Sequence, residues 1–220
     1  MNFDIGNKKG KMKILVLSPH ADDAELGCGG SIIKFLEMGH ELLWVVFSVA
    51  EESLPEHLPP DTLKKEFLNI MSKLNLKEEN YIVYNFKVRH LNEHRQEVLE
   101  NLIKIRNSYN PDLVIIPSLN DYHQDHCVIA NEAVRAFKTN ASIVGYELPW
   151  NHVTFDTNLF IKLDRSHIEK KFNLLKNYES QFLKKRNYFS QEYIFGLANV
   201  RGAQCNADYA EAFEVIRWIM

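Results

Sequence analysis

Two short polar segments of the chain carry side chains that could bind a divalent metal. The first segment contains His20, Asp22 and Asp23 and directly follows an apolar run at residues 13–17. Imidazole and carboxylate groups bind metals such as zinc, and a carboxylate left free beside the metal can act as a base. A simpler alternative is that the aspartates cap the next helix and that His20 lies in a turn.

The second segment has the same character. Residues 113–117 predict a buried strand, which is followed by His123, Asp125 and His126 and then by a helical pattern at residues 127–137. Two histidines and one aspartate drawn from both segments would leave one coordination position open for water. That arrangement is typical of catalytic zinc sites and not of closed structural ones.

The two segments together resemble the signature of the PIG-L/LmbE-like family, which are zinc-dependent de-N-acetylases of N-acetylglucosaminyl compounds. The likeness extends to Glu25, the glycine run at residues 27–30 and the C-terminal segment at residues 209–215. The chain departs from the family pattern at Ala21, where relatives more often have proline. It also has lysines within residues 61–66, where relatives often have arginine.

This resemblance implies a role for each matched residue. The metal ligands would be His20, Asp23 and His126, and the metal would be Zn²⁺ or Fe²⁺, since these ligands admit both. Asp22 would be the general base, His123 would be the cation that stabilises the oxyanion, and Asp125 would orient His123. The expected reaction is metal-dependent removal of the N-acetyl group from an N-acetylated amino sugar, with release of acetate.

Other polar side chains are candidates for contacts with the substrate. Trp150 follows the predicted strand at residues 142–146 and offers a ring face on which a sugar could stack, although it could equally cover the core. The remaining candidates lie beside the motifs or near the ends of predicted elements, and they are Glu25, Lys64, Arg89, His152 and Arg201.

The hydrophobic pattern alternates between strands and helices. Strands are expected at residues 13–17, 41–47, 81–84, 113–117, 142–146, 160–163 and 212–216. Helices are expected at residues 31–38, 62–74, 93–109, 127–137, 166–176 and 192–198. This pattern predicts an α/β fold, a Rossmann-like three-layer sandwich with a mostly parallel sheet in a single domain. A strand order 3-2-1-4-5 would bring the two polar segments together at the switch point of the sheet.

Length and composition narrow the class of protein. We expect a flexible tail at residues 1–12 and one deacetylase domain at residues 13–220, with a formal net charge of -3 that argues against binding nucleic acid. No apolar run approaches the roughly 18 residues of a membrane span. The three scattered cysteines predict a cytoplasmic location. The expected partner is a small-molecule or glycan-precursor amino sugar, and the resemblance is compatible with a homo-oligomer.

Other functions compete with deacetylation. The glycine run at residues 27–30 suggests dinucleotide binding, but the His and Asp residues separate it from the strand and the third glycine of the fingerprint is absent. A metal-dependent hydrolase of a phosphoester, an ester or another amide would use the same ligands. A catalytically silent sugar-binding protein would need neither a base nor an oxyanion donor.

Overall fold

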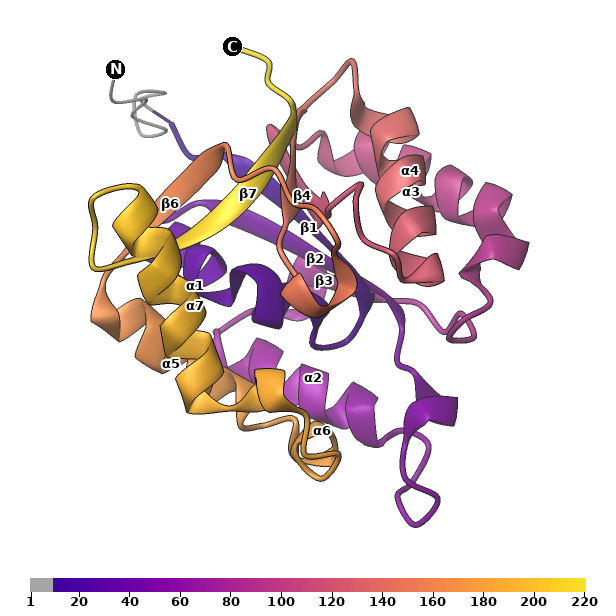
Figure 1. Ribbon diagram of the computed structural model, residues 1–220. Helices are drawn as coiled ribbons and strands as arrows, with labels where there is room; N and C mark the ends of the chain where they lie inside the picture. The colour runs from indigo at the N-terminus through magenta and orange to yellow at the C-terminus, as the bar shows by residue number, and fades with distance from the viewer. Residues whose placement is uncertain (1–9) are drawn as a thin grey trace.

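A seven-stranded sheet with the order β3-β2-β1-β4-β5-β7-β6 forms the centre of the molecule. The computed structural model describes residues 10–220, so most of the predicted tail lies outside the described residues. Strands β1 to β5 pair in parallel, and β7 runs antiparallel between β5 and β6. Helices cover both faces of the sheet (Figure 1). The predicted α/β sandwich and the order 3-2-1-4-5 are therefore confirmed.

The described elements follow the predicted alternation closely. The strands are β1 (Lys13–His20), β2 (Glu41–Ser48), β3 (Tyr81–Val83), β4 (Leu113–Pro117), β5 (Ser142–Tyr146), β6 (Leu159–Leu163) and β7 (Tyr209–Arg217). The α-helices are α1 (Asp23–Glu37), α2 (Thr62–Lys73), α3 (Arg95–Tyr109), α4 (Gln124–Phe137), α5 (Arg165–Leu175), α6 (Glu179–Phe182) and α7 (Gln191–Gln204). Short 3-10 helices are η2 (Glu51–Ser53), η3 (Glu78–Asn80), η4 (Leu91–His94), η5 (Pro149–Asn151) and η6 (Asn187–Phe189). No helix within residues 10–220 is both long and apolar enough to cross a bilayer.

The central strands are buried on both faces, which explains their continuous apolar sequences. Ile14 and Val16 of β1 join the core on the side of α1, α2, α5 and α7. Leu15 and Leu17 point to the opposite side and join the core beneath α3 and α4. Figure 1 shows these two groups of helices on opposite faces of the sheet. The layers leave the carboxyl ends of β1 and β4 side by side.

Helix α1 begins earlier than predicted. Its first residue is Asp23, whereas the sequence predicted a start at residue 31, because glycines at residues 27–30 lower the helical propensity of the segment. These glycines serve close packing instead. A Cβ built on Gly27 would lie 2.4 Å from Cδ2 of Tyr146 and 3.2 Å from the carbonyl oxygen of Glu147. The absence of a side chain thus lets α1 pack directly against the end of β5.

A buried ion pair supports α1 where its backbone leaves helical geometry, at Cys28 (φ −145°). The Lys171 ammonium donates to the Leu26 carbonyl oxygen at 2.7 Å and to Glu211 at 2.7 Å. Glu211 also accepts hydrogen bonds of 3.0 and 2.7 Å from the backbone amides of residues 30–31. Side chains from α5 and β7 therefore replace the backbone hydrogen bonds that the break removes.

We expect Gly27→Ala to lower the free energy of unfolding by about 1–3 kcal/mol, the usual cost of overpacking a core. Gly196→Ala is the matched control, because a Cβ at Gly196 in α7 would have no neighbour within 4 Å. The control should stabilise the protein by up to about 1 kcal/mol. Urea denaturation measures both values, and equal effects of the two variants would contradict the close approach.

Candidate metal centre

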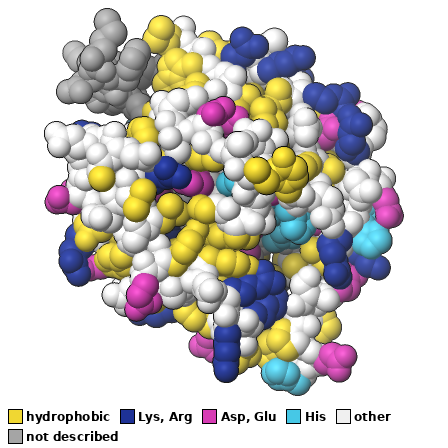
Figure 2. All heavy atoms as spheres, viewed as in Figure 1, with side chains coloured by type: hydrophobic (Ala, Val, Ile, Leu, Met, Phe, Trp, Pro, Cys, Tyr) yellow, Lys and Arg dark blue, Asp and Glu magenta, His cyan; other side chains and the backbone are white. Residues whose placement is uncertain are grey.

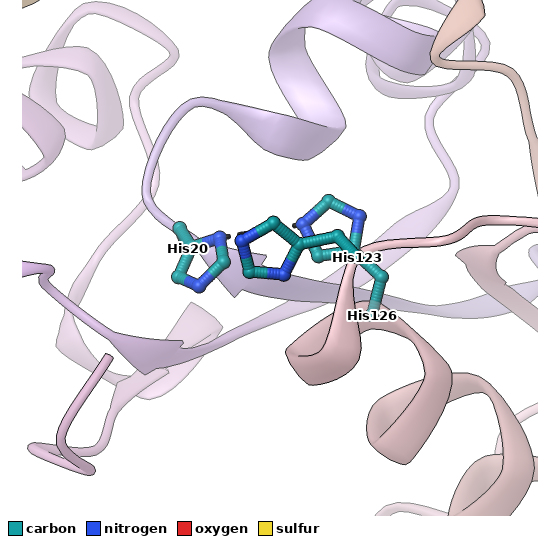
Figure 3. A group of neighbouring side chains, drawn as sticks. All are labelled: His20, His123 and His126. Carbon is teal, nitrogen blue, oxygen red and sulfur yellow. Dashed lines mark hydrogen bonds between the residues drawn. The ribbon is translucent and has the colours of Figure 1, made fainter. Parts of the chain in front are cut away.

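The two polar segments meet at the carboxyl edge of the sheet. His20 ends β1, and Asp22 and Asp23 begin α1. His126 lies in the first turn of α4, directly after the β4 loop, and His123 is the residue that precedes this helix. Because β1 and β4 are paired in parallel, both segments leave the sheet at the same end. One ligand atom each from His20, His123 and His126 lies within 4.8 Å of the others (Figure 3).

The tightest group of ligand atoms is a triangle centred on the Asp23 carboxylate. Asp23 Oδ2 lies 3.1 Å from Nδ1 of His20 and 3.1 Å from Nε2 of His126. The two imidazole nitrogens lie 3.3 Å apart. Ligands of a tetrahedral zinc ion with bonds of about 2.0–2.1 Å are separated by about 3.3 Å. The donor set and its spacing therefore fit a divalent metal.

Buried carboxylates fix the orientation of both imidazoles. Nε2 of His20 donates to Asp125 Oδ2 at 2.9 Å, and Nδ1 of His126 donates to Asp121 Oδ2 at 2.7 Å. With these nitrogens occupied, the other nitrogen of each ring faces the Asp23 carboxylate. Carboxylates that hold the outer nitrogen of a ligating histidine are common in metal sites, where they also raise the basicity of the ligand.

The carboxylates of this cluster favour protonated imidazoles at His20 and His126. Burial alone would lower the pKa of His20, but Asp23 and Asp125 raise it to about 9. Likewise, Asp23 and Asp121 raise the pKa of His126 to about 10 against the effect of burial. Although burial opposes it, these two histidines hold the pKa of Asp23 far below its usual value. A divalent metal would therefore displace protons from both imidazoles.

Asp22 lies beside the triangle in a strained backbone conformation. Its φ is 108°, in the left-handed region that non-glycine residues rarely adopt, and its side chain makes no capping hydrogen bond to α1. The simple capping alternative therefore does not describe Asp22. Burial and the neighbouring carboxylates of Asp23 and Glu25 raise the pKa of Asp22 well above its usual value. A raised pKa suits a carboxylate that accepts a proton near neutral pH.

His123 differs from the cation that the family resemblance implied. Burial and the charges of His126 and His20 lower the pKa of His123 to about 4, so its imidazole is neutral at neutral pH. A divalent cation among the ligands would disfavour a second positive charge in the same way. Nδ1 of His123 accepts a hydrogen bond of 3.2 Å from the Asp125 amide. The proton of the neutral ring therefore lies on Nε2, where it is available to an acceptor.

Asp125 also differs from its expected role of orienting His123 through its carboxylate. That carboxylate is fully buried and accepts from His20 Nε2, from the Arg89 amide at 2.6 Å and from the Leu91 amide at 3.2 Å. Only the backbone of Asp125 contacts His123. The reason is geometric: Asp125 lies in the first turn of α4, and its side chain points toward β1. Asp125 therefore positions His20, a candidate metal ligand.

A cleft opens from the metal centre to solvent and encloses about 670 Å³, including its mouth. Asp22, Asp23 and the three histidines form part of its wall. Residues from α1, α2, loops and short helices complete it, and they are Leu26, Ala50, Ser53, Leu63, Val88, Trp150, Asn151, Gln181, Lys184, Arg186 and Tyr188. Figure 2 shows this face of the molecule hollowed near exposed histidine atoms.

Of the predicted substrate contacts, Trp150 lines the cleft and the others lie elsewhere. The Trp150 ring stacks on Tyr188, with centroids 3.8 Å apart and planes 10° apart, so one of its faces is already covered. Lys64 is exposed on α2, and Arg89 contributes its backbone amide to Asp125. Side chains at these two positions do not line the described cleft.

The other three candidates have structural partners instead. Glu25 is buried, and its carboxylate accepts from the Tyr178 hydroxyl at 2.6 Å. Arg201 forms a bidentate ion pair with buried Glu147, including a 2.9 Å contact from Nε to Oε2. Nε2 of His152 accepts from the Leu148 amide at 2.9 Å. Charge and position in the sequence suggested substrate contacts, but these side chains form hydrogen bonds or ion pairs with other residues of the chain.

Sequence reasoning missed several residues that the structure brings to the site. Asp121 is buried, holds His126 and accepts from the His123 amide at 2.8 Å. Asn151 donates to the same Asp121 carboxylate at 3.2 Å. Asp121 stands in the second polar segment, so its residue type was a usable signal. The sequence signal for Lys184 and Arg186 was only a run of basic residues after α6, in a segment where no helix or strand was predicted.

Comparisons with known proteins agree with this geometry. The family model of PIG-L, described as GlcNAc-PI de-N-acetylase, matches residues 15–137, which include both polar segments. A curated relative named "Uncharacterized deacetylase YaiS" from Escherichia coli (strain K12) is 24% identical over 170 residues, which covers 76% of this chain and 90% of the relative.

Solved structures share the fold at low sequence identity. N,N'-diacetylchitobiose deacetylase from Pyrococcus horikoshii superposes with a TM-score of 0.78 at 23% identity, covering 97% of this chain and 87% of that one. 4-Carboxy-2-hydroxymuconate hydratase from Pseudomonas putida KT2440 gives a TM-score of 0.74 at 19% identity, covering 95% and 98%. Since one is named a deacetylase and the other a hydratase, the reaction must be argued from the residues of the site.

We expect metal binding at neutral pH to release about two protons, because both imidazoles are protonated in the metal-free protein and neutral when they bind a metal. Metal affinity should then rise by up to about 100-fold per pH unit below the pKa values of about 9 and 10. Calorimetric zinc titrations in buffers of different ionisation enthalpy count the protons. Zinc binding without proton release would contradict this charge assignment.

Asp121→Asn should weaken zinc binding by about 10–100-fold, because it replaces the carboxylate that orients His126 with a neutral amide. The control is Asp156→Asn, which changes the same type of side chain at an exposed position. Competition with a fluorescent zinc chelator measures both affinities. If both variants bind zinc as the unmodified protein does, Asp121 does not support the ligand.

Proposed function

The chain belongs to the PIG-L family, and we propose that it is a metal-dependent de-N-acetylase acting on an N-acetylated amino sugar. The observation that carries the proposal is the triangle of His20, Asp23 and His126 at the floor of an open cleft, with Asp22 beside it. The family description, which names a de-N-acetylase of an N-acetylglucosaminyl compound, supports the same reaction and substrate class.

His20, Asp23 and His126 would hold the metal, and Zn²⁺ or Fe²⁺ would suit two imidazoles and one carboxylate. Bound there, the metal would act as a Lewis acid that polarises the amide carbonyl and acidifies water. The carboxylates of Asp121 and Asp125 keep both imidazoles in the ligating tautomer.

Asp22 accepts the proton of the attacking water. Its carboxylate lines the cleft, and its strained backbone turns it away from the capping position that an aspartate before a helix usually takes. Since Asp23 is a metal ligand, the adjacent Asp22 remains free to act as the base. The proton it gains is then available to the leaving amine, which must be protonated before the C–N bond breaks.

His123 stabilises the oxyanion as a neutral hydrogen-bond donor. Its Nδ1 accepts from the Asp125 amide, so its Nε2–H is free to donate to the carbonyl oxygen as negative charge develops there. His123 lines the cleft together with the metal ligands. A fixed donor of this kind is worth on the order of 10²–10³ in rate.

The substrate is a small-molecule or glycan-precursor amino sugar whose N-acetyl group enters the cleft toward the metal. Trp150 and Tyr188 form an aromatic wall of this cleft, and aromatic faces suit the apolar face of a sugar ring. Self-association and a cytoplasmic location stay predictions.

We expect Asp22→Asn to retain zinc and to lose about 10²–10⁴-fold in kcat, because the amide cannot accept the proton. Acetate release from zinc-loaded protein is measured across a panel of N-acetylglucosaminides that differ in the aglycone, with chelator-treated protein as the control. Near-normal turnover by the variant would show that Asp22 is not the base.

The same panel tests the proposed function. Chelator-sensitive acetate release from at least one member supports deacetylation. If zinc is bound and no member releases acetate, the cleft serves another metal-dependent hydrolysis or binds a sugar without turnover.

A further inference from the structure

The cleft has a basic wall that the proposed chemistry leaves without a role. Lys184 and Arg186 line it, on the segment between α6 and η6. In Figure 2, Lys and Arg side chains gather beside the hollow and close to histidine atoms. A carbonyl, a water molecule and a neutral sugar need no cationic wall, so these side chains require a separate explanation.

Neither cation has a carboxylate partner. The Lys184 ammonium donates to Oε1 of Gln181 at 2.9 Å, and the Arg186 guanidinium donates to the Tyr188 hydroxyl. Both partners are neutral. Within residues 10–220, no ion pair of 4.0 Å or less involves Lys184 or Arg186. Most surface lysines and arginines lose little by being unpaired, but these two face a cleft.

The two cations also oppose each other. Lys184 is half-buried, and burial together with the charge of Arg186 lowers the pKa of its ammonium. The carboxylates of Asp22 and Glu66, which lie beyond ion-pair distance, partly offset this effect. Holding like charges together on one wall costs free energy in the empty cleft. An anion placed between them would relieve this repulsion and form charge-assisted hydrogen bonds with both.

The wall is held in position by aromatic contacts. The Arg186 guanidinium lies over the Tyr188 ring, 5.6 Å from its centroid, and that ring stacks on Trp150. Trp150 belongs to η5, which follows β5, so the stack ties the basic segment to the carboxyl edge of the sheet. A positioned guanidinium suits bidentate binding of an oxyanion, whereas Lys adds a point charge.

We propose that Lys184 and Arg186 bind an anionic group of the substrate, so that the preferred substrate is an N-acetylated amino sugar that also carries a phosphate or a carboxylate. This inference rests on the proposed deacetylation and specifies its substrate class. The acetamide enters toward the metal while the anionic group lies against the basic wall. The cations predicted from the sequence, Lys64, Arg89 and Arg201, lie outside this cleft.

The test compares kcat/KM for acetate release from N-acetylglucosamine 1-phosphate, N-acetylglucosamine 6-phosphate, N-acetylmuramic acid and neutral methyl N-acetylglucosaminide. The readout is the ratio of each anionic substrate to the neutral one. We expect at least one ratio to exceed about 10, as one charge-assisted hydrogen bond allows. Which ratio is largest distinguishes a phosphate from a carboxylate.

Lys184→Met and Arg186→Gln should each reduce that ratio about 10-fold or more. Lys185→Gln is the matched control, because Lys185 is the exposed residue between them and does not line the described cleft. The control should keep the ratio of the unmodified protein. Added salt should lower the ratio in the unmodified protein, since Arg186 is exposed and its charge is screened.

The inference is overturned if no anionic substrate is preferred, or if the preference survives both substitutions in folded protein. If no compound is hydrolysed, the proposed function fails. Calorimetric binding of the same four compounds to zinc-loaded protein then tests separately whether the basic wall binds an anionic group. Tighter binding of an anionic sugar that Lys184→Met weakens and Lys185→Gln does not would then support the wall. Equal binding of charged and neutral sugars would reject it.

Discussion

The Asp23 carboxylate joins the two halves of the site, because a single oxygen lies 3.1 Å from an imidazole nitrogen on each side. His20 comes from the end of β1 and His126 from the start of α4, about 100 residues later in the chain. Without protons or a metal between them, the lone pairs of the two imidazole nitrogens and of the Asp23 oxygen would repel one another at this spacing. The parallel pairing of β1 with β4 therefore determines the chemistry that this edge of the sheet can perform.

Much of the remaining structure holds this convergence in place. Asp125 and Asp121 are buried so that each can orient one imidazole. Farther away, Lys171 and Glu211 support α1 where its backbone breaks, which keeps its first turn, and with it Asp23, against the sheet. The last third of the chain thus supports the candidate site through α5 and β7. The same third supplies the basic wall, which comes from the segment between α6 and η6.

The sheet order and the position of the candidate site could be predicted because both follow from patterns in the local sequence. Apolar runs mark the buried strands, and polar residues directly after two such runs mark the site. The substrate cleft could not be predicted in this way. Lys64, Arg89 and Arg201 have suitable charges, but none of them lines the cleft. Lys64 is exposed on α2, Arg89 has a positive φ, and Arg201 forms an ion pair with Glu147. Lys184 reaches the cleft through an irregular segment whose path depends on tertiary packing.

The roles of His123 and Asp125 show the same limit at shorter range. The family resemblance implied that the Asp125 side chain orients His123, yet the contact runs from the Asp125 amide to the His123 ring. The Asp125 carboxylate turns instead to His20, which is adjacent only in the folded chain. Protonation depends on this arrangement too, since burial and the neighbouring charges of His126 and His20 together lower the pKa of His123.

Anomalous diffraction from crystals of the zinc-loaded protein tests the central claim most directly. The account predicts one zinc ion about 2.0–2.2 Å from Nδ1 of His20, Nε2 of His126 and an oxygen of Asp23, with a position open to the cleft. Zinc bound by His20, His123 and His126, with Asp23 outside the coordination sphere, would contradict it. That result would remove His123 as the oxyanion donor and leave Asp23, not Asp22 alone, as a candidate base.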